Sequence, residues 1–245
     1  MKNILVLGHK GMLGHMVVEY LHTHDVIVHI LDKPWPECKD KIKEFYGCCI
    51  INCIGAIPQK TDNFDINWQL PIWLDLNVEC KVIHPGTDCE MDKDEYGISK
   101  NIAANYIRNL SKNTKSLKTS ILGPELNGNS SLFEWFLSQK EEVYGYTEAI
   151  WNGNTTLEWA KQCWQLINNW EDYNTETILQ GEKISKYNFI LDVAQNLNLN
   201  CKNLKACKKQ NDLDLTIPDK NAFIYPYREG LSFLCKNLLD KRYEK

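Results

Sequence analysis

The chain has 245 residues, of which 43% are hydrophobic and 24% are charged, with a formal net charge of −4 and a pI near 5.9. These values fit a globular protein with a substantial core, and a mildly acidic chain lacks the basic surface expected of a nucleic-acid binder. No apolar run approaches the ~20 residues of a membrane span. Because the first residues lead directly into a strand pattern, we expect a cytoplasmic protein without a signal peptide.

Apolar runs and helical periodicity alternate over the first half of the chain. The expected elements, in order, are a strand at 1–7, a glycine turn and helix at 8–24, a strand at 25–31, a short helix at 40–47, a strand at 48–55, a helix at 66–78, a strand at 80–88, a helix at 96–110 and a strand at 117–123. Such alternation predicts an α/β protein with a doubly wound, Rossmann-like parallel sheet covered by helices on both faces.

The pattern changes after Gly123. We expect a helix within 123–139, a loop-rich stretch at 142–153, a helix at 155–170, a late strand at 176–182, and helices at 184–199 and 230–243. The sequence therefore predicts an NAD(P)-binding Rossmann domain at 1–122, which the strand near 176–182 can rejoin. A smaller substrate-binding lobe, mainly 123–245, would lie over the carboxyl edge of the sheet, where ligands bind in such folds.

Ten cysteines are scattered along the chain, without a C-x-x-C pair or a His and Cys combination at zinc spacing. Three of them, Cys48, Cys49 and Cys53, lie in or beside an apolar strand pattern. Reduced, buried thiols that pack as small hydrophobic groups account for this pattern best. We expect no metal site.

The first motif lies between the first strand and the first helix, where Gly8, Gly11 and Gly14 recur at three-residue spacing. Glycines let the backbone turn sharply and approach a pyrophosphate, which the free N–H groups of the helix N-terminus then hold. Asp32 ends the second strand, where a group that contacts the adenosine ribose is expected. The predicted dinucleotide site also includes the residues between the glycines, which are His9, Lys10, Met12 and Leu13.

Two cofactors fit this motif. The Asp32 carboxylate can accept hydrogen bonds from the ribose 2′-hydroxyl of NAD. Lys10 and Lys33 can instead pair with the 2′-phosphate of NADP. We favour NADP over NAD.

The second motif is a Tyr and a Lys four residues apart, Tyr96 and Lys100, whose side chains share one face of an expected helix. A nearby ammonium favours the phenolate and lowers the pKa of a Tyr. The Tyr can give a proton to a carbonyl oxygen while a nicotinamide delivers a hydride to the carbon. Thr87, at the end of the preceding strand, can hydrogen-bond the same oxygen. The arrangement indicates a carbonyl reductase.

Together these residues resemble the extended short-chain dehydrogenase/reductase superfamily and, within it, the dTDP-4-dehydrorhamnose reductase family of sugar-nucleotide 4-ketoreductases. The likeness covers most of the chain, in the blocks GHKGMLG, IINCIGAIPQ, INWQLPIWL, KVIHPGTDC, YGISK, TSILGPEL, SLFEWFLSQ, GYTEAIWNGNTTLEWAK and ISKYNFILDVAQ. It implies NADPH-dependent reduction of an NDP-4-keto-6-deoxyhexose in deoxysugar synthesis. Dimers are common on this fold, so a homodimer is possible by analogy.

The resemblance also implies residue roles. Thr87, Tyr96 and Lys100 form the catalytic set, with the last two also beside the cofactor. The cofactor would further contact Asn52, Ile54 and Gly55. The nucleotide-sugar side is expected to involve Asp88, Cys89, Glu125, Trp135, Trp151 and Asn152, although the two Trp fit a core role equally well.

The chain departs from the family pattern at three places. Relatives carry a longer loop with a Val-Phe-x-Gly turn between the Thr and the Tyr, whereas only DCEMDKDE joins Thr87 to Tyr96 here. A strand end and a helix start can be adjacent across so short a loop. The segment 32–48 is also short, so a strand or helix usual there is expected to be absent, and Gly86 stands where a Ser is usual.

Three other functions fit parts of the pattern. Sugar-nucleotide 4,6-dehydratases need an acid/base pair after the Thr, usually Asp-Glu, where this chain has Asp88 and Cys89. A 3,5-epimerase needs its own acid/base pair, for which Cys89 or His84 could serve. A cofactor-binding partner protein, similar to the regulatory subunit of methionine adenosyltransferase, would tolerate a shortened loop.

Overall fold

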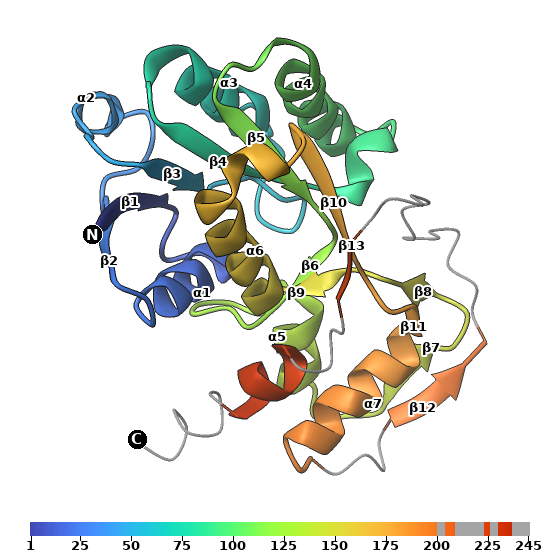
Figure 1. Cartoon of the computed structure of the whole chain (residues 1–245). Helices are drawn as coiled ribbons and strands as arrows, with labels where there is room; N and C mark the ends of the chain where they lie inside the picture. The colour runs from blue at the N-terminus through green and yellow to red at the C-terminus, as the bar shows by residue number, and fades with distance from the viewer. Residues whose placement is uncertain (200–203, 209–222, 226–229, 237–245) are drawn as a thin grey trace. The chain divides into compact units, whose positions relative to one another are not determined.

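The computed structural model describes residues 1–199, 204–208, 223–225 and 230–236 (Figure 1). The chain forms two compact units. Unit 1 comprises Met1–Thr119 and Trp159–Ile178, and unit 2 comprises Ser120–Glu158 and the described residues from Leu179 onward.

Unit 1 is built on a parallel sheet whose six strands follow the order β2–β1–β3–β4–β5–β10. The strands are β1 (Lys2–Leu7), β2 (Val26–Ile30), β3 (Cys49–Asn52), β4 (Lys81–Gly86), β5 (Thr114–Lys118) and β10 (Glu176–Gly181). The chain first moves outward from β1 to β2 and then returns to the other side of β1 at β3. The predicted Rossmann-like sheet is confirmed, and its switch point, where ligands bind in open α/β sheets, lies between β1 and β3.

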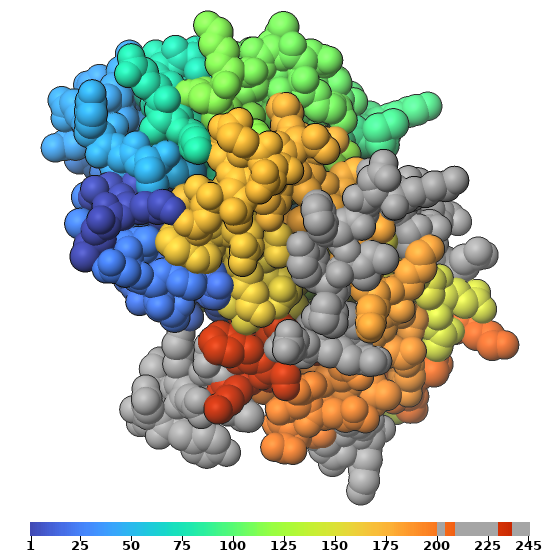
Figure 2. Space-filling model, in the orientation of Figure 1, coloured from blue at the N-terminus to red at the C-terminus, as the bar shows by residue number. Residues whose placement is uncertain are grey.

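Helices cover both faces of this sheet, α1 and α6 on one face and α2, α3 and α4 on the other (Figure 1). Their bounds are α1 (Met12–Leu21), α2 (Lys39–Lys43), α3 (Ile66–Asn77), α4 (Glu95–Leu110) and α6 (Thr156–Asn168). The surfaces of α1 and α6 meet in Figure 2. His24, which follows α1, stacks on Trp164 of α6 with ring centroids 4.5 Å apart. Two short 3-10 helices, η1 (Asp88–Met91) and η2 (Trp170–Asp172), complete the unit.

The prediction of buried thiols holds only in part, because Cys49 is buried whereas Cys48 and Cys53 are half-buried. Nine cysteines lie within the described residues and all are free, while Cys201 lies outside them. Cys49 in β3 and Cys163 in α6 are both 0% exposed, and burial raises the pKa of each thiol well above its ordinary value. These two cysteines therefore act as small hydrophobic groups of the core.

Unit 2 consists of helices and short two-stranded ladders. The helices are α5 (Leu132–Ser138), α7 (Lys186–Asn196) and residues 230–236. The strand pairs are β6 (Ile121–Leu122) with β9 (Asn154–Thr155), β8 (Ile150–Trp151) with β11 (Ile184–Ser185), β7 (Val143–Tyr146) with β12 (Leu204–Cys207), and the end of β10 with β13 (Phe223–Tyr225). Its core contains Phe133, Trp151, Phe189 and Leu231.

The sequence-based bounds are wrong in two places. The strand expected at 117–123 is two elements, because β5 already begins at Thr114 and ends at Lys118, whereas Ile121–Leu122 pair with β9. The hydrophobic pattern did not predict the start of β5, because Thr114 and Ser116 are polar residues that are nevertheless buried. The stretch at 142–153, expected to be loop-rich, contains β7 and β8. Residues 237–243 of the last expected helix lie outside the described residues.

No helix of the described residues combines the length and the apolar character needed to cross a membrane.

Asp75, in the last turn of α3, organises the connection from α4 to β5. Its carboxylate accepts hydrogen bonds from the hydroxyls of Ser111 (2.7 Å), Thr114 (2.8 Å) and Tyr106 (3.0 Å), and from the backbone N–H groups of the two residues after Ser111. Burial raises the pKa of Asp75, but these hydrogen bonds outweigh it, so the pKa lies below its usual value. The ionised carboxylate is therefore part of the folded structure.

Replacing Asp75 with Asn should destabilise unit 1 by about 2–3 kcal/mol, because an amide offers fewer acceptor sites to these donors. The folded-state pKa is lowered, so this stabilisation is present above the unfolded pKa and is lost as the pH falls through the folded pKa. Urea unfolding between pH 7 and pH 3 measures both effects. The exposed Asp25→Asn is the control, and equal stability of the two variants at pH 7 would contradict the assignment.

Candidate active site

The glycine turn joins β1 to α1 at the switch point of the sheet. Gly8 has a φ of +77°, in the left-handed region that favours glycine, and a Cβ there would lie 2.9 Å from the backbone of Cys53. The Gly11 N–H donates to the Gly8 carbonyl (2.9 Å). A Cβ on Gly14 would lie only 2.1 Å from that same carbonyl oxygen. The first turn of α1 therefore packs directly against the end of β1, which only glycine permits.

The N-terminus of α1 suits a phosphate group. Gly11 occupies the cap position, and no side chain within the described residues caps the helix. Met12 and Leu13, predicted as cofactor contacts, are the first two residues of α1, and their N–H groups point toward the helix start. A left-handed glycine, a close helix approach and an uncapped N-terminus at the switch point together fit the pyrophosphate of NAD(P).

A charged group stands at the end of β2, where the adenosine ribose is expected. The Asp32 carboxylate accepts a hydrogen bond from Lys10 Nζ (2.8 Å) and lies 3.6 Å from His9 Nε2. The hydrogen bond from Lys10 lowers the pKa of Asp32. Lys33 is exposed beside it. The group offers a carboxylate to a 2′-hydroxyl and lysines to a 2′-phosphate, so it accommodates either nicotinamide cofactor.

The sheet ends at β2 within the described residues, and the short segment after Asp32 contains only α2. The edge position leaves Ile27 and Ile30 of β2 43% and 45% exposed. The short segment 32–48 led us to expect that a strand or helix would be missing there, and in this segment the structure has no further strand beside β2.

The end of β3 lies between the glycine turn and α4. Asn52 is fully buried; its Nδ2 donates to His84 Nδ1 (3.1 Å) and its Oδ1 accepts from the Ile54 N–H (3.0 Å). The Ile54 side chain lies 2.9 Å from where a Cβ on Gly8 would be, and a Cβ on Gly55 would lie 3.5 Å from Lys100 Nζ. Asn52 thus shapes a turn that carries the backbone past both predicted motifs.

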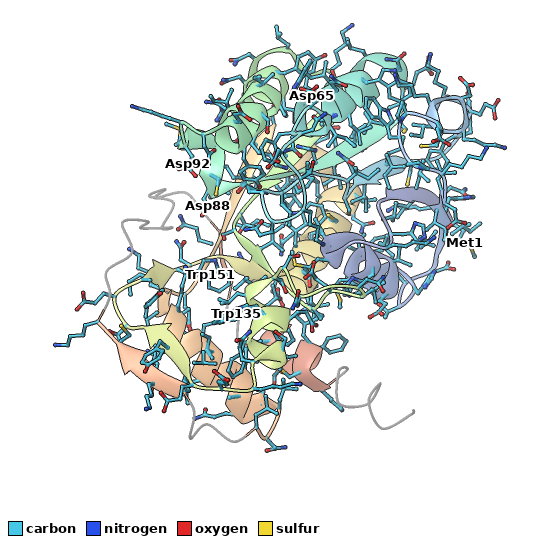
Figure 3. The ribbon with its side chains drawn as sticks, turned by 180° about the vertical axis from the view of Figure 1, so that it is seen from behind. Met1, Asp65, Asp88, Asp92, Trp135 and Trp151 are labelled. Atoms are coloured by element: carbon cyan, nitrogen blue, oxygen red, sulfur yellow. The ribbon has the colours of Figure 1, made fainter. Side chains whose placement is uncertain are left out.

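The shortened connection between Thr87 and Tyr96 is ordered by η1, an element that the sequence did not predict. The Thr87 hydroxyl accepts from the Cys89 N–H (3.3 Å). It also accepts from the Glu90 N–H, while Glu90 Oε1 accepts from the Thr87 N–H (3.3 Å). This reciprocal pair is a capping box. Figure 3 shows Asp88 and Asp92 on this connection. A Thr followed three residues later by a Glu was the sequence signal for it.

Thr87, Tyr96 and Lys100 converge at this end of the sheet. Burial raises the pKa of Tyr96, the charge of Asp88 acts in the same direction, and a hydrogen bond with Thr87 opposes them. Lys100 Nζ lies 6.0 Å from the centroid of the Tyr96 ring. The expectation that Lys100 lowers the pKa of Tyr96 is therefore wrong for this structure, because burial dominates. Tyr96 is protonated at neutral pH, the state required of a proton donor.

Lys100 is 8% exposed on the inner face of α4. Burial lowers its pKa to about 8, while the charge of Glu90 acts in the opposite direction. The pKa of the neighbouring His84 falls well below its ordinary value through burial and the charge of Lys100, so the imidazole is neutral. The site therefore combines a neutral phenol, a neutral imidazole and a mostly protonated amine.

Asp88 and Cys89 lie beside this group. Asp88 Oδ1 accepts from the Thr87 hydroxyl (3.1 Å), and Asp88 Oδ2 is buried without a hydrogen-bond partner among the described residues. Burial raises the pKa of Asp88 and raises the pKa of Cys89 to about 12. The Cys89 side chain is thus a protonated thiol at neutral pH.

The remaining predicted residues belong to unit 2, where Figure 3 labels Trp135 and Trp151. Trp151 is 4% exposed in the core, and its Nε1 donates to the Ser120 hydroxyl (2.9 Å), whereas Trp135 on α5 is 37% exposed. The buried Asn152 accepts from the Gly181 N–H through its carbonyl (2.6 Å). Glu125 Oε2 accepts from the two N–H groups that precede α5.

Unit 2 contains a pocket of about 190 Å³ beside Trp151. Its wall is mainly apolar and includes one amine, and the lining residues are Ser120, Leu122, Leu132, Trp151, Lys186 and Phe189. Burial lowers the pKa of Lys186, and no carboxylate of the described residues forms an ion pair with it. The sequence analysis did not single out Lys186.

No protein-family model matches the sequence, and no curated protein matches it either. Solved structures do match over nearly the whole chain. A dTDP-4-dehydrorhamnose reductase from Bacillus anthracis in complex with NADP is 15% identical, with a TM-score of 0.76, and the match covers 96% of this chain and 99% of that one. A dTDP-glucose 4,6-dehydratase from the same organism, in complex with NAD, is 14% identical, with a TM-score of 0.72 and coverage of 98% and 97%.

A UDP-N-acetylglucosamine 4-epimerase from Bacillus cereus is 16% identical, with a TM-score of 0.70 and coverage of 98% and 97%. The chain therefore has the fold of NAD(P)-dependent enzymes that modify sugar nucleotides, a class that includes reductases, dehydratases and epimerases. At these identities the likeness establishes the fold, and the activity has to be argued from the site.

The glycine turn gives a direct test of the cofactor site. Gly8→Ala should weaken NADPH binding strongly, because it combines a left-handed φ, which costs roughly 1–2 kcal/mol, with a Cβ inside the backbone contact of Cys53. Gly128→Ala is the matched control, since Gly128 has a φ of +99° but 4.0 Å of space around its Cβ position. NADPH fluorescence titration measures both. Equal affinities in the two variants would contradict the assigned site.

Proposed function

We propose that this protein is an NAD(P)H-dependent reductase of the 4-keto group of an NDP-4-keto-6-deoxyhexose. The observation that carries the proposal is the convergence of Thr87, protonated Tyr96 and buried Lys100 beside an uncapped, glycine-lined helix N-terminus. This set supplies a proton and orients a carbonyl next to a dinucleotide site. The whole-chain likeness to sugar-nucleotide enzymes supports the substrate class.

In this proposal each residue of the site has its own role. Gly8, Gly11 and Gly14 with the start of α1 would hold the pyrophosphate of the cofactor, which when bound supplies a hydride. The Thr87 hydroxyl would donate a hydrogen bond to the carbonyl oxygen of the substrate, which polarises the carbonyl. Tyr96 would donate the proton to that oxygen as it becomes an alcohol. Lys100, protonated below a pH of about 8, stabilises the phenolate that Tyr96 leaves behind.

Reduction fits the residues after Thr87 better than the other chemistries of this fold. Dehydration requires an acid/base pair, and Cys89 occupies the second position with a pKa raised to about 12. A 3,5-epimerisation requires a base that removes a proton from carbon. His84 is 3% exposed and its Nδ1 is occupied by Asn52, and the Cys89 thiol stays protonated. Simple proton donation by Tyr96 has no such requirement.

Two further assignments belong to this proposal. NADPH is the favoured cofactor, because Lys10 and Lys33 flank the adenosine end of the site. On the substrate side, Lys186 supports an anionic ligand, since this amine lines an apolar pocket with Trp151 and has no carboxylate partner in the described part of the chain. A nucleotide sugar carries both an aromatic base and a diphosphate.

The Tyr96→Phe variant should lose most of its turnover, about 100-fold or more, because no proton donor remains, while its NADPH affinity stays unchanged. Enzymatically generated dTDP- and UDP-4-keto-6-deoxy sugars are mixed with NADPH, and the loss of absorbance is followed. Tyr46→Phe, at a 97% exposed position, is the control. Full activity of Tyr96→Phe would refute the assigned proton donor. Tight NADPH binding without turnover of any sugar would favour a partner-protein role.

The pH dependence of kcat/KM should report Lys100. The amine is protonated below its folded-state pKa of about 8, so reduction should be constant at neutral pH and fall as the pH rises through 8. Because the pKa of Tyr96 is raised, ionisation of Tyr96 adds no further change in kcat/KM in this pH range. Lys100→Arg, which retains its charge at all accessible pH values, should abolish the alkaline limb. A wild-type profile that stays flat above pH 9 would contradict this role.

A further inference from the structure

Glu90 is a buried carboxylate that none of the steps above uses. It lies in η1, between Thr87 and Tyr96, and is 2% exposed. Its two oxygens have separate partners, because Oε1 accepts from the Thr87 N–H (3.3 Å) and Oε2 accepts from Lys118 Nζ (2.7 Å). Lys118 itself is 7% exposed. A single side chain therefore connects the backbone of a candidate catalytic residue to the sheet.

The sheet is shaped to allow this connection. Gly86, the last residue of β4, lies opposite Lys118 in the β4–β5 ladder. A Cβ on Gly86 would lie 2.9 Å from Lys118 Cβ and 2.8 Å from the Ser116 hydroxyl. A side chain there would displace Lys118 from its path to Glu90. Gly86 and the short loop from Thr87 to Tyr96 thus belong to one arrangement.

Other charged groups face this pair from each neighbouring element. Arg108 of α4 lies 3.9 Å from Glu90 Oε2 and 3.4 Å from Glu176 of β10. On the inner side is Lys100, whose pKa burial lowers and the charge of Glu90 partly restores, and the neutral His84 of β4 faces Lys100. Burial raises the pKa of Glu90, while its hydrogen bond with Lys118 lowers it. Glu90 is thus the carboxylate whose charge acts on Lys100 most directly.

We propose that Glu90 is a positioning residue of the reductase site: hydrogen-bonded both to Lys118 of β5 and to the Thr87 N–H, it anchors Thr87 to the sheet, and its carboxylate acts electrostatically on the site. The inference rests on the proposed function and deepens it. Lys118 holds the Glu90 carboxylate by a hydrogen bond, and that carboxylate accepts a hydrogen bond from the Thr87 N–H. The capping box then determines on which side of η1 the Thr87 hydroxyl lies. The anchor replaces the support that a longer loop would provide.

Two substitutions separate the two effects. Glu90→Gln keeps an oxygen for the Thr87 N–H but removes the charge, so the alkaline limb of kcat/KM should move to lower pH by about one unit. The double variant Glu90→Leu with Lys118→Met removes both buried charges together, which is often neutral for stability. It should stay folded and bind NADPH normally, yet lose about 10-fold or more in kcat, because Thr87 is no longer held.

Glu176→Gln is the matched control. Glu176 shares Arg108 with Glu90 but has no contact with Thr87 among the described residues. Its variant should keep the wild-type kcat, KM and pH profile. If the double variant keeps the wild-type kcat, or if Glu176→Gln loses as much activity as Glu90→Gln, the positioning role is wrong.

A measurement without substrate distinguishes this inference from the proposed function. The Lys100 side-chain carbon signals are followed against pH by NMR in protein with ¹³C-labelled lysine, assigned with Lys100→Arg. The midpoint should be near 8 in the wild type and in Glu176→Gln, and about one unit lower in Glu90→Gln. An unchanged midpoint in Glu90→Gln overturns the inference. A shifted midpoint in a protein that reduces no 4-keto sugar overturns the proposed function instead.

Discussion

The ion pair between Glu90 and Lys118 is the interaction on which the candidate active site depends. Both side chains are buried, at 2% and 7% exposure, and their atoms approach to 2.7 Å. Removing two charges from water costs several kcal/mol for each ion, so such a pair persists only where good geometry and further hydrogen bonds compensate. The Thr87 N–H and Arg108 provide those contacts. Because this ion pair anchors the connection from β4 to α4, eight residues are enough to hold Thr87 beside Tyr96.

Burial controls the electrostatics of the site more than any single charge does. It raises the pKa of Tyr96 and of Cys89, and it lowers the pKa of Lys100 and of His84. All four shifts favour the neutral form. The outcome suits proton donation by a phenol and disfavours chemistry that needs a thiolate or an imidazolium. Lys100 retains most of its charge at neutral pH because the Glu90 carboxylate offsets part of its desolvation.

Much of unit 1 could be predicted from the sequence, because its strands are apolar runs and its glycines occupy positions where backbone geometry allows nothing else. Gly8 is favoured by its own left-handed φ of +77°, and Gly14 is required by its close contact with the Gly8 carbonyl six residues earlier. Tyr96 and Lys100 share a helix face through local periodicity alone. These are short-range constraints, and the pattern of a sequence contains them.

Buried polar groups could not be predicted in the same way. Asp75 and Glu90 look like surface acids in the sequence, yet their partners lie 31–39 and 28 residues away. The start of β5 was missed because Thr114 and Ser116 are polar and buried. Lys186 could be recognised as a candidate ligand-binding residue only from the pocket that it lines in the structure. Each depends on contacts between distant segments, and hydrophobic periodicity carries no information about them.

The central claim is that hydride reaches the 4-keto carbon of a nucleotide sugar while this chain supplies the proton. The most direct test uses NADPH deuterated at the nicotinamide C4 on either face, with dTDP- or UDP-4-keto-6-deoxy sugars, and product analysis by mass spectrometry and NMR. The account predicts that one of the two labelled cofactors places a single deuterium at C4 of the sugar, with one NADPH oxidised per product. Binding of NADPH without deuterium at C4 of any sugar would contradict it.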